Sequence, residues 1–156
     1  MNFKPLFFVL AACASLAHAA DSPSSISNTP RTTVSERLAT ARTAIVAKDW
    51  GRAVTELSAA AREEPRNADV HNLLGYSYRK SATPDITKAF EHYYTALKID
   101  PRHKGAHEYI GEAFLMEKRP IEAEKHLADL EKICGNKTCA EYVDLSKSIA
   151  EFKAKN

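Results

Sequence analysis

Alanines, large apolar residues and prolines recur along this 156-residue sequence with matched spacings. Two copies of the pattern, 36 residues apart, are Ala53, Leu57, Ala60 and Pro65, and then Ala89, Tyr93, Ala96 and Pro101. A third copy carries Ala123, Leu127 and Leu130 and lacks the proline. A period of this length indicates a fold in which one small structural unit is stacked on the next.

The segment from residue 33 to residue 156 carries repeated signals for helix starts. Thr33 and Glu36 have the spacing of a capping box, in which the hydroxyl and the carboxylate each bond a backbone amide. The further start signals are Asp49, Asn67, Thr83-Pro84, Pro120, and Thr138 with Glu141. No segment alternates apolar and polar residues as a half-buried strand does. The sequence therefore predicts an all-α domain with seven helices of roughly 12 to 16 residues.

Two further matches identify the repeat. Leu74-Gly75 and Tyr78 match Ile110-Gly111 and Phe114, again 36 residues on. Together with the alanines and prolines, this pattern resembles the tetratricopeptide repeat (TPR) family, a helix–turn–helix repeat of about 34 residues. The resemblance implies a TPR domain at 33–156, an α-solenoid of three helix–turn–helix repeats and a C-terminal capping helix. The expected bounds are about 34–67, 68–103 and 104–137 for the repeats and 139–154 for the capping helix.

Residues 1–19 have the features of a signal peptide. Lys4 precedes an apolar run at residues 6–16, and Ala17-His18-Ala19 offers small residues for cleavage. The run is shorter than the ~20 residues that a membrane-spanning helix needs. We therefore expect an exported bacterial protein, periplasmic or secreted, that is cleaved after Ala19. Residues 20–32 are polar and rich in serine and proline, which predicts a disordered tether.

A second interpretation of the same leader involves Cys13. Leu10-Ala11-Ala12-Cys13 resembles the lipobox of bacterial lipoproteins, in which the cysteine is lipidated after cleavage. The alternative hypothesis is a lipid-anchored protein of an envelope membrane that takes part in assembly. Contact with a membrane is expected only under this alternative.

Export also sets the expectation for Cys134 and Cys139. An oxidising compartment favours a disulfide between this even pair. Four residues separate the two cysteines, whereas disulfide oxidoreductases have two residues between theirs, which argues against a redox centre. The alternative of a thiol-active protein that uses Cys134 and Cys139 depends on the position of Cys139 in a first helical turn, which favours a thiolate. The ending of Cys134, Cys139, Glu141 and Tyr142 resembles that of small exported proteobacterial TPR proteins.

The sequence offers little for catalysis, cofactors or metals. His103 and His107 are one helical turn apart, but His71 with His107 and His92 with His126 occupy equivalent repeat positions, which indicates an architectural role. Neither a glycine-rich phosphate loop nor a glycine-flanked serine nucleophile is present. The net charge of +2 gives no basic stripe for nucleic acid. We expect no enzyme, no cofactor, no metal site and no nucleic-acid partner.

The remaining candidate is the concave face that the first helices of TPR hairpins form. The repeat positions that the resemblance assigns to this groove carry aromatic residues and charges of both signs. The candidate partner-binding residues are Arg42, Asn72, Tyr76, Arg79, Glu108, Tyr109 and Glu112. Rigid aromatic side chains beside hydrogen-bonding groups suit an extended peptide or a partner helix. The predicted function is an exported protein–protein interaction module that aids assembly of an envelope complex.

Overall fold

The computed structural model describes residues 32–156, which form seven α-helices and no strand. The helices are α1 (Val34–Val46), α2 (Trp50–Glu63), α3 (Ala68–Lys80), α4 (Ile86–Ile99), α5 (Lys104–Met116), α6 (Pro120–Cys134) and α7 (Ala140–Lys155). The predicted signal peptide, Cys13 and residues 20–31 of the predicted tether lie outside the described residues. The all-α prediction is confirmed for the described part of the chain.

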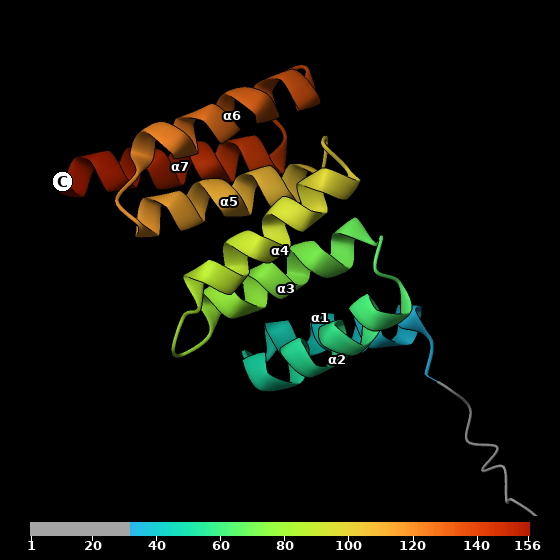
Figure 1. Ribbon diagram of the computed structural model, residues 1–156. Coiled ribbons are helices and arrows are strands. Elements are labelled where there is room, and N and C mark those ends of the chain that lie inside the picture. The colour runs from blue at the N-terminus through green and yellow to red at the C-terminus, as the bar shows by residue number, and fades with distance from the viewer. Residues whose placement is uncertain (1–31) are drawn as a thin grey trace, which may run out of the picture. The chain divides into compact units, whose positions relative to one another are not determined.

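The helices pack as hairpins in chain order. α1 pairs with α2, α3 with α4 and α5 with α6, and each hairpin contacts the next one along the chain (Figure 1). α7 packs against both α5 and α6, just as α5 contacts both α3 and α4. The predicted solenoid of three hairpins with a capping helix is therefore the observed fold.

Small residues at the matched repeat positions allow this close packing. Ala53, Ala89 and Ala123 are all fully buried. At Gly75, an added Cβ would lie 2.5 Å from the Tyr93 ring and 2.9 Å from the backbone oxygen of Ala89. Because real Cβ atoms do not come so close to a backbone oxygen, α3 and α4 could not hold their present distance with a larger residue there.

Polar residues cap the first three helices as predicted. The capping box is present, with the Glu36 amide donating to Thr33 Oγ1 at 3.2 Å and the Thr33 amide donating to Glu36 Oε2 at 2.8 Å. Asp49 and Asn67 accept from the amides of Arg52 and Val70. Pro120 occupies the first turn of α6.

Two of the predicted start signals are wrong. α4 is capped by Asp85, whose carboxylate accepts from the Lys88 amide, and not by Thr83-Pro84. α7 begins after Cys139 and has no side-chain cap. The Thr138 hydroxyl donates to Asn136 Oδ1 at 2.8 Å within the turn, so this hydroxyl does not cap the helix.

Candidate functional site

A hollow of about 420 Å³ lies between the first helices of two successive hairpins and the capping helix. The lining comes from α3, α5 and α7, together with the C-terminal residue. The lining residues are Arg79, Lys80, Glu112, Leu115, Met116, Ser148, Glu151, Phe152, Lys155 and Asn156. This is the face on which the sequence predicts the partner-binding groove, and two of the predicted residues line it.

The contribution of α7 is the part that the sequence analysis missed. Lys80, Met116 and Phe152 all line the hollow and follow one another at intervals of 36 residues. Arg79, Leu115 and Glu151 repeat that interval one position earlier; they close the same hollow. Applying the 36-residue offset a second time would have identified these α7 residues. The helix therefore lines the hollow as well as capping the stack.

An arginine and two tyrosines pack together beside the hollow, and the arginine lines it. The rings of Tyr76 and Tyr109 lie 4.8 Å apart between centroids, and the Arg79 guanidinium carbon is 5.5 and 5.6 Å from them. Arg79 Nε donates to the Tyr93 hydroxyl at 3.2 Å, and its Nη2 pairs with Glu112. Because Arg79 is only 5% exposed, its guanidinium interacts with groups of the protein and not with solvent, and it holds both tyrosine rings in place.

Glu112 links three helices at the floor of the hollow. One carboxylate oxygen accepts from Arg79 of α3, and the other accepts from the Ser148 hydroxyl of α7 at 3.4 Å. A carboxylate on α5 that bonds both neighbours holds the three lining helices in register. These contacts fix the relative positions of Arg79, Glu112 and Ser148.

Glu108 carries an unusual carboxyl on the same face of α5. Burial, together with the nearby carboxylates of Glu112, Asp144 and Glu141, raises the pKa of Glu108 to about 8. At pH 7 this group is therefore largely protonated and can donate a hydrogen bond. Burial likewise raises the pKa of Tyr109 to about 12, so its hydroxyl keeps its proton.

Asn72 and Arg42 stand apart from the other predicted groove residues. Asn72 is buried beside the first turn of α5, where a Cβ added at Gly105 would lie 2.9 Å from its Nδ2. Arg42 is exposed on α1, and within residues 32–156 no hydrogen bond or ion pair joins it to the other six. The structure therefore brings together Tyr76, Arg79, Glu108, Tyr109 and Glu112.

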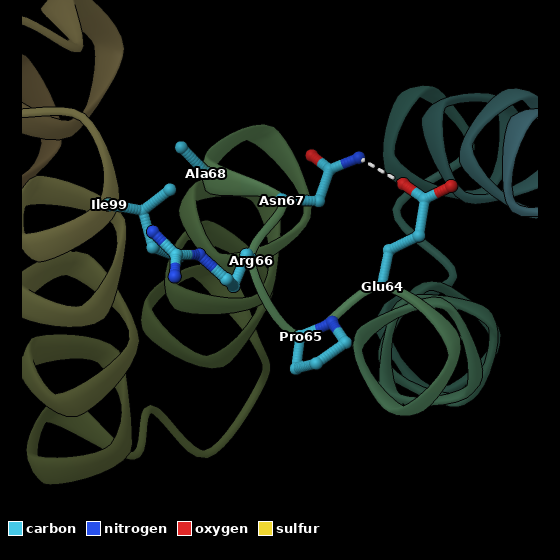
Figure 2. Close-up of a pocket in the computed structure, with 6 residues that line it drawn as sticks. All are labelled: Glu64, Pro65, Arg66, Asn67, Ala68 and Ile99. Atoms are coloured by element: carbon cyan, nitrogen blue, oxygen red, sulfur yellow. Dashed lines mark hydrogen bonds between the residues drawn. The ribbon is translucent and has the colours of Figure 1, made fainter.

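A second hollow of about 580 Å³ lies at the turn between α2 and α3 (Figure 2). Its lining is that turn, residues 64–68, with Ile99 of α4. Asn67 is already used there: its Nδ2 donates to Glu64 Oε2 at 2.8 Å, and its Oδ1 accepts from the Val70 amide. Because the hollow consists of helix-end contacts, we do not assign a binding role to it.

Cys134 and Cys139 form a disulfide that joins the end of α6 to the start of α7, with the sulfurs 2.07 Å apart. The bond ties α7, and with it one wall of the hollow, to the last hairpin.

Within the described residues, no helix has the combination of length and apolar sequence needed to cross a membrane.

No family model and no curated protein matches the sequence. Among solved structures, the chain is similar to the crystal structure of the Sgt2 TPR domain from Aspergillus fumigatus, with a TM-score of 0.68. The match covers 86% of this chain and 84% of that chain at 19% sequence identity. A likeness at this identity shows the fold, which is TPR-like as the resemblance implies.

Proposed function

We propose that this chain is an exported interaction module that binds a peptide or a partner helix on the face formed by α3, α5 and α7. The observation that carries the proposal is the hollow between these helices, whose lining residue Arg79 pairs with Glu112 and also lies over the Tyr76–Tyr109 aromatic pair. Rigid aromatic surface that is organised in advance costs little entropy on binding. The protein offers this surface beside half-exposed Met116 and charged Lys80 and Glu151.

Export to the periplasm or to the medium is part of the proposal, and it is supported by the sequence of residues 1–19. In that compartment the partner would be another envelope protein whose assembly the module aids. The intact mass of the mature protein tests the route. Cleavage after Ala19 is the expected result, and a lipid-modified N-terminus at Cys13 would show the anchored alternative to be right.

Photo-crosslinking from the hollow identifies the partner. A photoreactive amino acid at Met116, which is 47% exposed, should capture a specific protein in cells that express the full chain. The matched control places the same amino acid at Tyr94 on α4, which is 50% exposed and does not line the hollow. Equal capture from both positions would contradict the proposed face.

Affinity measurements with the captured partner then test the residues. We expect Tyr76→Ala with Tyr109→Ala to weaken binding by about 30-fold, because buried aromatic residues dominate interface energies. Tyr94→Ala should leave the affinity unchanged. Because the tyrosines also support Arg79, the exposed variant Met116→Asp provides a second test that keeps the aromatic pair. The proposal fails if both groove variants bind as the unaltered protein does.

A further inference from the structure

Two pairs of histidines make the same contacts in consecutive hairpins. The Nδ1 atoms of His71 and His92 lie 3.2 Å apart, and those of His107 and His126 lie 3.0 Å apart. In each pair the first histidine also places Nε2 3.1 Å from the carbonyl oxygen of the proline that follows the preceding hairpin. A carbonyl oxygen only accepts, so Nε2 of His71 and of His107 carries the proton. The Nδ1 lone pair of each then points to the second histidine.

The two pairs differ in the residue three positions after the second histidine. In α6 this residue is Asp129, and one of its carboxylate oxygens lies with one ring nitrogen each of His107 and His126 so that the three atoms are within 4.8 Å of one another. In α4 the equivalent residue is Thr95, whose hydroxyl donates to the backbone oxygen of Glu91 at 2.8 Å. Only the last hairpin therefore adds an anionic ligand to its histidine pair.

We propose that His107, His126 and Asp129 form a binding site for a divalent transition-metal ion, with Zn²⁺ as the best fit. Two imidazole nitrogens and one carboxylate oxygen are ligands that Zn²⁺ uses, and they leave a fourth position for water. The hydrogen bond from His107 Nε2 to Pro101 is the outer-shell contact that typically orients a zinc-binding histidine. The inference does not depend on the proposed function.

The geometry requires only small changes. A tetrahedral ion holds two histidine nitrogens about 3.3 Å apart, given Zn–N distances of about 2.0–2.1 Å, and the observed separation is 3.0 Å. The proton between the two rings moves to Nε2 of His126, so that both Nδ1 atoms face the ion. Asp129 leaves its exposed pair with Lys132, which costs little. His107 is buried, but His126 and Asp129 are partly exposed, so the ion enters from their side.

This inference replaces the expectation of no metal site. His103 and His107, the pair one turn apart, do not converge: His103 caps α5 through Nδ1 and pairs with Asp69 through Nε2 at 3.0 Å. The histidine pairs are indeed a repeated architectural feature. The two histidine pairs differ because α6 has Asp129 where α4 has Thr95, and the sequence prediction did not take this difference into account.

Zinc titration of the full chain, with its disulfide intact, tests the site. We expect one Zn²⁺ per chain in competition with a chromophoric chelator. Asp129→Asn should weaken binding at least about tenfold, and His126→Gln should weaken it more. The matched control His92→Gln changes the equivalent pair without a carboxylate and should leave zinc binding unchanged. Thr95→Asp should add a second zinc ion by completing the equivalent site in α4.

Asp129 is half-exposed and its one ion pair is at the surface, so Asp129→Asn is expected to fold even if His126→Gln does not. The unaltered protein and Asp129→Asn therefore decide the question. The site is refuted if the unaltered chain binds no zinc under these conditions, or if Asp129→Asn binds zinc as tightly as the unaltered chain does.

Discussion

At Gly75 the absence of a side chain sets the distance between two helices. Tyr93 fills the space above the glycine and carries the hydroxyl to which Arg79 donates. One glycine thus determines both the packing of α3 on α4 and the position of the arginine that orders the proposed binding face. A change at this residue should affect stability and the site together.

Gly75→Ala is expected to lower the free energy of unfolding by about 3 kcal/mol, because the added carbon meets the Tyr93 ring and backbone of α4. Urea denaturation followed by circular dichroism measures this change. Gly51→Ala is the matched control: its nearest contact is Asp49 Oδ1 at 3.9 Å, so it should gain up to about 1 kcal/mol of helix propensity. Equal effects of both substitutions would rule out close packing at Gly75.

Glu108 should make stability depend on pH. Its pKa is raised from 4.5 to about 8, so the folded state holds a proton that the unfolded state releases above pH 4.5. The free energy of unfolding should therefore fall as pH rises from about 4.5 to about 8. Because the side chain keeps some solvent contact, we expect about 1 kcal/mol rather than the full value of the shift.

Glu108→Gln replaces the titrating carboxyl with an amide that stays neutral. The free energy of unfolding should then fall less as pH rises, so that the variant is more stable than the unaltered protein at pH 8.5. Urea denaturation at pH 5.5 and pH 8.5 gives the comparison. Glu91→Gln, at an exposed glutamate of α4, should retain the original pH dependence. If Glu108→Gln also retains it, the carboxyl titrates in the ordinary range.

Among the elements, α7 depends most on a covalent link. The disulfide closes a short loop between Cys134 and Cys139, and α7 has no side-chain cap at its start. Its buried residues Leu145 and Ile149 pack against the last hairpin, and Ser148 donates a hydrogen bond to Glu112 of α5. A helix held in this way should be sensitive to reduction.

Replacing both cysteines with serine should lower the free energy of unfolding by about 2 kcal/mol, the entropy that a loop of this size contributes. Denaturation of the unaltered protein with and without a reductant gives a parallel measurement. The two losses should agree. A loss below about 0.5 kcal/mol in both would mean that packing alone holds α7.

The helices could be predicted from sequence because their signals are local. Caps such as Thr33 with Glu36 lie within one turn, and the alanines and glycines recur in register. The start of α4 was missed because Asp85, directly after Thr83-Pro84, offers the capping carboxylate. Thr138 was misread because Asn136, two residues earlier, takes its hydroxyl.

The candidate site was less predictable because its contacts join separate helices. Nothing local to Arg79 shows that Tyr93 of α4 and Glu112 of α5 enclose its guanidinium. The burial of Asn72 likewise depends on the approach of Gly105 from the next hairpin. Repeat equivalence predicted which face to consider, but the position of each side chain on that face required the packed structure.

In the described part of the chain, successive hairpins leave one face lined by α3, α5 and α7, and no residue of α2, α4 or α6 lines it. The proposed function assigns the partner to this face. It also makes the capping helix part of the binding surface. The proposal therefore predicts that a bound polypeptide contacts α3, α5 and α7 and leaves α2, α4 and α6 free.

Amide NMR spectra of the ¹⁵N-labelled protein, titrated with the captured partner segment, measure this directly. We expect the largest chemical-shift changes at residues that line the hollow on all three helices, among them Lys80, Glu112 and Ser148. Changes concentrated on α2, α4 and α6, with these residues unaffected, would contradict the assignment of the binding face.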